Sequence, residues 1–150
     1  MSVFGFVSLF IVVISVAVII LHYRLMRKRA PVDVHFDQLE ELLRQWIENL
    51  YHISPVGSGL YNLCDQYIDL EFSDILSAMP EIHDFCEQEQ QDSSTNIATI
   101  NDTISALNRA ISEYNAFIAK TPATVLMAHI LGLKTMEPIE PLCEKGEPLS

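Results

Sequence analysis

The first 30 residues of this 150-residue chain contain no aspartate or glutamate. Within them, the stretch from Val3 to Leu21 also contains no lysine or arginine. Nineteen helical residues at about 1.5 Å each cover about 28 Å, close to the hydrocarbon thickness of a bilayer. This length predicts a membrane-spanning helix, because buried core helices of soluble proteins have shorter apolar runs.

The chain also has no positive charge ahead of this apolar run. A secretory signal carries that charge before a run of about 7–15 residues, so the pattern favours a retained anchor over a cleaved signal. Basic residues follow the run and should stay on the cytoplasmic side, with residues 3–29 in contact with the lipid bilayer. We therefore expect a single-pass protein of the cell membrane with its N-terminus outside and its C-terminal domain in the cytoplasm. The predicted anchor residues are Val3, Phe4, Leu21, Tyr23, Arg24, Arg27, Lys28 and Arg29.

Basic residues are scarce after residue 30. This part of the chain contains five lysines and arginines and all twenty acidic residues, so its formal charge is −15. Such an acidic surface repels phosphate, which excludes nucleic acid as a partner. Cysteine is scarce too: Cys64, Cys86 and Cys143 form no Cys-x-x-Cys pair, as expected in a reducing compartment.

Catalytic and metal-binding motifs are absent from the sequence. No histidine has glutamate three residues before it, as a di-metal carboxylate bundle would need. His83 and Cys86 share a helical face, but no second ligand cluster accompanies them. We therefore expect no catalytic residue, no metal and no cofactor. A small-ligand or metal-binding helical enzyme with a pocket near His83 and Cys86 remains the alternative.

Helical periodicity dominates the rest of the chain, and no strand pattern competes with it. Pro31 is expected to end the anchor helix, and Pro80 to end or kink another. The helices predicted after the anchor run from 33 to about 52, from 60 to about 79, from about 95 to 120 and from 123 to 131.

The third of these helices has the clearest pattern. Apolar residues recur at alternating steps of three and four, which predicts a seam that packs against neighbouring helices as in a coiled coil. The seam consists of Ile97, Ile100, Ile104, Leu107, Ile111, Tyr114 and Ile118.

These patterns predict an all-α protein: a single N-terminal transmembrane helix followed by an antiparallel up-and-down helical bundle. The expected divisions are an anchor with its basic cluster (1–30), a cytoplasmic bundle (31–136) and an acidic, proline-containing, flexible tail (137–150).

Two blocks resemble the LemA family of bacterial inner-membrane proteins. The first is Asp33-Val34-His35-Phe36, and the second comprises Asn108, Tyr114-Asn115, Pro122 and Gly132. The chain resembles a divergent member, since Leu107 and Ile104 stand where the family has tyrosine and arginine. The resemblance implies a single-pass protein with a helical cytoplasmic domain, no established enzymatic activity and a link to envelope maintenance.

The function predicted from these observations is protein–protein interaction without catalysis. The anchor would display an acidic helical bundle at the cytoplasmic membrane face, where restriction to a plane raises the effective concentration of weak partners. The partner would be a membrane or cytoplasmic protein, or a second copy of this chain.

Overall fold

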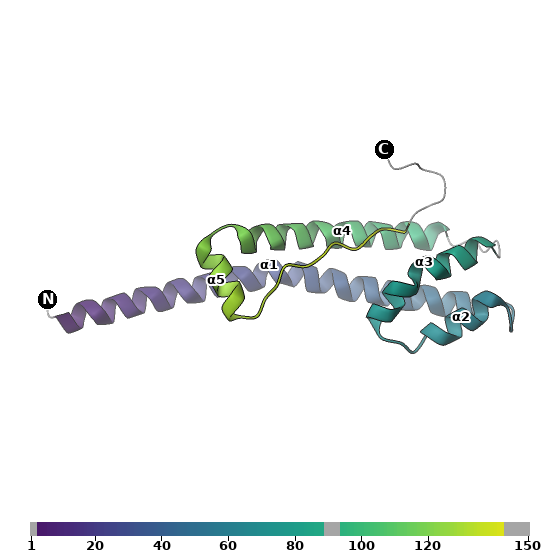
Figure 1. Cartoon of the computed structure of the whole chain (residues 1–150), viewed down its shortest axis with the longest axis horizontal. Coiled ribbons are helices and arrows are strands. Elements are labelled where there is room, and N and C mark those ends of the chain that lie inside the picture. The colour runs from purple at the N-terminus through teal and green to yellow at the C-terminus, as the bar shows by residue number, and fades with distance from the viewer. Residues whose placement is uncertain (1–2, 89–93, 143–150) are drawn as a thin grey trace, which may run out of the picture. The chain divides into compact units, whose positions relative to one another are not determined.

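The computed structural model describes residues 3–88 and 94–142. It contains helices α1 (Val3–Ile53), α2 (Gly59–Tyr67), α3 (Phe72–Gln88), α4 (Ser94–Ala119) and α5 (Pro122–Ile130), shown in Figure 1. No strand occurs in the described part of the chain. The all-α prediction, with one long apolar N-terminal helix leading into a helical bundle, is therefore confirmed.

The described residues form two compact units. One comprises 3–34 and 107–138, and the other comprises 35–88, 94–106 and 139–142. We call them the anchor unit and the distal unit. The range 31–136, predicted to form one bundle, is divided between the two units. The reason is helix length: α1 has 51 residues, about 76 Å at helical rise, so contacts gather around different parts of it.

The predicted helix break at Ala30–Pro31 is wrong, because α1 continues through Pro31. A proline inside a helix costs about 3 kcal/mol, since it lacks an N–H and clashes with the preceding turn. Leu25 and Val32, on either side of it, are fully buried. Burying two such side chains contributes about 3–6 kcal/mol, enough to offset that cost. Pro31 and Arg27 are both exposed, so water can solvate the Arg27 carbonyl, which a proline at position 31 leaves without a helical N–H partner.

The predicted helix from 60 to about 79 is also wrong, because two helices occupy this region. α2 begins at a Ser58 cap, whose hydroxyl accepts a hydrogen bond from the Tyr61 amide (3.1 Å). α2 and α3 pack against each other, which requires the chain to turn between them. α3 then continues through Pro80, because Ile75, Met79, Ile82 and Cys86 form one buried stripe across it.

In the distal unit the core is built on α1 around Trp46, with contributions from the other three helices. Its fully or nearly fully buried members are Leu39, Leu43, Trp46, Ile47, Leu50, Leu60, Cys64, Ile75, Met79, Ile82, Cys86, Ile97, Ile100 and Ile104. At its edge, the rings of Tyr51 and Tyr61 stack with centroids 4.6 Å apart, and their hydroxyls lie 2.8 Å apart. The hydrogen bond to Tyr61, aided by burial, raises the pKa of Tyr51 to about 12.

In the anchor unit the core combines all three helices present there. Its buried apolar residues are Leu25, Val32, Leu107, Ile111, Tyr114, Ile118, Met127 and Ala128. A capping box fixes the start of α5: Thr121 and Thr124 each accept a hydrogen bond from the other's backbone amide. Gly132 follows the helix at φ +65°, a left-handed conformation that glycine adopts without strain.

The predicted flexible tail does not begin at residue 137. Leu142 is buried, and its backbone is hydrogen-bonded to a side chain of α4. Residues 133–142 contain no helix or strand, and Figure 1 draws them as an extended trace. The remaining tail residues, 143–150, lie outside the described part of the chain.

Candidate functional site

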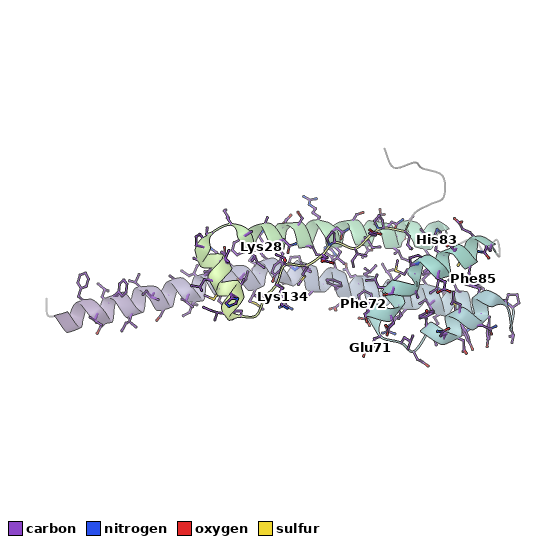
Figure 2. The ribbon with its side chains drawn as sticks, in the orientation of Figure 1. Lys28, Glu71, Phe72, His83, Phe85 and Lys134 are labelled. Carbon is purple, nitrogen blue, oxygen red and sulfur yellow. The ribbon has the colours of Figure 1, made fainter. Side chains whose placement is uncertain are left out.

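The N-terminal part of α1 has a fully uncovered apolar surface. Every residue from Gly5 to Ile20 is exposed, including large side chains such as Phe6, Phe10 and Ile19. Figure 2 shows side chains projecting from the N-terminal part of α1 with no other element beside it. α1 is long and apolar enough to cross a membrane. The first residue of α1 that the rest of the chain partly covers is Leu21, which is half-buried. Leu25 is the first fully buried residue.

The basic cluster follows this uncovered surface directly. Tyr23, Arg24 and Arg27 are exposed, and the two arginines have no ion-pair partner among the described residues. Lys28 lies 3.3 Å from Glu113 of α4, and Arg29 lies 3.5 Å from Asp33. Such exposed pairs stabilise by at most about 1 kcal/mol, so both cations can also interact with anionic groups outside the protein. Val3 and Phe4 are the first two residues of α1, and their side chains lie outside the described part of the structure.

All seven residues of the predicted seam on α4 are buried in the structure. Three lie in the distal unit and four, from Leu107 onward, lie in the anchor unit. Tyr114 is completely buried, and its hydroxyl has no hydrogen-bond partner among the described residues. Burial raises the pKa of Tyr114; Arg29 opposes this effect and Asp33 reinforces it. The seam therefore supplies core packing, with one polar atom left unsatisfied.

Asn115 of α4 holds the extended segment through backbone atoms. Its side-chain amide donates to the Met136 carbonyl (2.7 Å), and its side-chain oxygen accepts from the Met136 amide (3.0 Å). Because both bonds go to the backbone, the contact does not depend on the identity of the bound side chain. We call such a pair of bonds an asparagine clamp.

The distal unit contains a second asparagine clamp. Asn101 donates to the Leu142 carbonyl (2.9 Å) and accepts from the Leu142 amide (2.8 Å). Asn101 and Asn115 are fourteen residues apart, which is about 21 Å along a helix. Leu142 and Met136 are six residues apart, which is about 20 Å along an extended chain. The two spacings are nearly equal, so one helix can bind one extended segment at both positions. Asn101 was not among the residues predicted from the sequence. The available signal was the recurrence of asparagine at seven-residue intervals, 101, 108 and 115.

We expect Asn115→Leu to lower the free energy of unfolding by about 1–3 kcal/mol, because two hydrogen bonds of about 0.5–1.5 kcal/mol each are lost. Hydrogen exchange at the Met136 amide should become faster in the same variant. The control is Asn49→Leu, at an exposed position of α1 without such bonds. Unchanged exchange at Met136 would show that Asn115 does not hold the segment.

The family-motif residues have local structural roles. Asp33 pairs with Arg29, Val34 is exposed and Asn108 is half-buried on α4. Pro122 is in the first turn of α5, where its missing N–H costs nothing. The Gly132 amide donates to the His129 carbonyl (3.1 Å), which terminates that helix.

His83 and Cys86 both belong to α3 and both are buried. Figure 2 labels His83 on this helix, and its Nε2 lies 3.6 Å from Oε1 of Glu87. In the described part of the chain, Cys64 and Cys86 are not joined by a disulfide. Over the described ranges, no three or more histidine, cysteine or carboxylate side chains gather in a group that could hold a metal. The geometry around His83 and Cys86 is that of a packed helix face.

The anchor unit thus contains an uncovered apolar helix segment, the basic cluster that follows it and one asparagine clamp, and the distal unit contains the second clamp. No family model, no curated protein and no solved structure matches this chain, so the resemblance to the LemA family stays a prediction.

Proposed function

We propose that this chain is a non-enzymatic, single-pass membrane protein that displays an acidic helical bundle for protein–protein interaction at the cytoplasmic membrane face. The LemA resemblance adds envelope maintenance as the process it serves. One observation carries the proposal: the apolar surface from Gly5 to Ile20 is uncovered, yet belongs to the same helix as the packed units. Lipid is the environment that matches such a surface.

The position of the basic cluster supports the proposed orientation. Arg24 and Arg27 lie immediately after the apolar run and are exposed without ion-pair partners in the described chain. Lysine and arginine next to a span remain on the cytoplasmic side. The N-terminus would therefore lie outside the cell, and both units inside.

The charge of the helical part supports interaction with a basic protein surface. On α1, Asp37, Glu40, Glu41 and Glu48 line one open depression of about 390 Å³ together with Arg44 and Gln45. Arg44 bonds to Glu40 (2.9 Å), and the other three carboxylates remain exposed along this face. Such a surface attracts cationic partners and repels nucleic acid and anionic lipid.

The anchor and its orientation are tested together in intact cells that express the full chain. The protein should stay in the membrane pellet after alkaline extraction. With Cys64, Cys86 and Cys143 replaced by serine, an impermeant maleimide should label a Ser2→Cys variant in whole cells, and label a Gln45→Cys variant only after lysis. Release of the protein by alkali would contradict the span, and the reverse labelling pattern would contradict the orientation.

The interaction is tested with a photocrosslinking residue at position 45, inside the acidic face of α1, in native membranes. We expect a discrete adduct with another protein or a second copy, and we expect Glu41→Lys with Glu48→Lys to abolish it. Asp102→Lys, at an exposed site on α4, is the matched charge-reversal control. An adduct that persists in the doubly reversed variant would contradict an acidic interaction surface.

A further inference from the structure

α5 exposes large apolar side chains on the side that does not pack. Thr124, Met127 and Ala128 face the core and are buried. Val125, Leu126 and Ile130 on the other side are 50%, 60% and 68% exposed. A short helix in a soluble environment normally places polar residues there. These three side chains form what we call the α5 outer face.

This outer face lies at the end of the anchor unit that meets the apolar run of α1. Val125, Leu126 and His129 line a depression of about 600 Å³ together with residues 119–122, the end of α4 and the following turn. Within the anchor unit, α4 runs antiparallel to α1 and Glu113 lies 3.3 Å from Lys28, so the C-terminal end of α4 is directed toward the apolar run of α1 (Figure 1). Figure 1 also shows α5 lying across the direction of α1 rather than along it.

The packing of α1 locates this end relative to the span. Leu21 is half-buried and Leu25 is fully buried, and within the anchor unit residues 107–138 supply that cover. The cover therefore begins where the charge-free stretch ends. A helix that crosses α1 at this level lies in the plane of the membrane surface when α1 spans the bilayer.

The charge around α5 differs from that of the rest of the helical part. Residues 114–136 contain no carboxylate and two lysines, Lys120 and Lys134. Figure 2 labels Lys134 just beyond α5 and Lys28 on α1. Arg24 and Arg27 are also exposed, on the part of α1 next to Leu25. The anchor unit therefore has several exposed cations that can bind anionic lipid headgroups.

We propose that α5 is an interfacial helix whose outer face inserts into the cytoplasmic leaflet of an anionic phospholipid bilayer, beside the α1 span. This inference rests on the proposed membrane span. Leu126 and Ile130 enter the boundary between headgroups and acyl chains, about 5–10 Å deep, as the apolar faces of interfacial helices do. Lys120 and Lys134 remain at headgroup level. The helix thereby fixes the rotation of the anchor unit on the membrane, which a single span alone leaves free.

The experiment uses the full chain reconstituted in vesicles of phosphatidylcholine and phosphatidylglycerol. A tryptophan is placed at the outer face (Leu126→Trp), in the span (Val12→Trp) or at an exposed site of α4 in the same unit (Ser112→Trp). Trp46 is buried and common to all variants, so the unmodified chain supplies the background. Quenching is then compared for lipids brominated near the top and near the middle of the acyl chains.

We expect the added fluorescence of the Leu126→Trp variant to be blue-shifted and quenched most by shallow bromines. The Val12→Trp variant should be quenched most by deep bromines, and the Ser112→Trp variant should show no added quenching. Quenching in the span variant without quenching in the outer-face variant would overturn the interfacial helix and leave the span intact. Absence of quenching in both would overturn the span as well.

A second copy of the chain is the competing occupant of the outer face. In that case the fluorescence of the Leu126→Trp variant would stay unquenched, and its blue shift would grow with the protein-to-lipid ratio. That result would assign the outer face to contact between copies, which also overturns the lipid proposal.

Discussion

Replacing Ile104 by alanine is expected to lower the free energy of unfolding by about 2–5 kcal/mol, the usual cost of truncating a buried isoleucine. Ile104 is completely buried in the seam of α4, within the distal unit. The loss combines the transfer free energy of the removed carbon atoms with the cost of the cavity that remains. Urea-induced unfolding of the full chain in detergent micelles measures it, because the fluorescence of buried Trp46 in the same unit reports on the transition.

The matched control is Ser105→Ala, one position further along α4 on its exposed side. Exposed helix positions usually change stability by no more than about 0.5 kcal/mol. Equal effects of the two substitutions would show that α4 does not bury its seam, and would contradict the core described above.

Replacing Pro31 by alanine is expected to raise the free energy of unfolding by about 3 kcal/mol, the difference in helix propensity between the two residues in a helix interior. The expectation depends on α1 being continuous, since alanine restores the amide that a helix needs four residues after Arg27. The measurement is the urea midpoint of the full chain followed by far-ultraviolet circular dichroism. A helix that ended at Ala30 would gain no such stability.

Alanine substitution of two other prolines compares the effect of proline on stability inside a helix with its effect at a helix start. Pro80→Ala, inside α3, should stabilise in the same direction as Pro31→Ala. Pro122→Ala should not stabilise, because proline in the first turn of α5 has the dihedral angle the helix needs and loses no hydrogen bond. A gain at position 122 as large as that at position 31 would contradict the local argument.

The two prolines also show why helix boundaries were not predictable from local signals. Proline by itself disfavours a helix interior, which predicted a break at Pro31 and a break or kink at Pro80. The local cost of about 3 kcal/mol is smaller than the gain from burying residues on both sides of the proline. Around Pro31 these are Leu25 and Val32, and around Pro80 they are Met79 and Ile82. That gain depends on which other segments cover the helix, and the covering segments are distant in sequence.

The candidate site divides in the same way. The apolar run and the basic residues after it are local in sequence, so their place on one uncovered helix was predictable. The asparagine clamps were not, because each joins α4 to a segment 21 or 41 residues away. The residue bound by Asn115 is Met136, whose backbone lies outside any helix, so no helical periodicity pointed to it.

Three features could be read from the order of the residues: the all-α class, the long apolar helix at the N-terminus and the buried face of α4. All three follow from periodicity and charge along contiguous residues, which act through helix geometry and solvation alone. Three others depend on long-range packing: α1 is unbroken, residues 136–142 are held against α4, and α5 turns apolar side chains outward. In each case the local conformational preference of a segment is set against the free energy of burying it on a segment distant in sequence. The position of that distant segment is determined only when the chain folds.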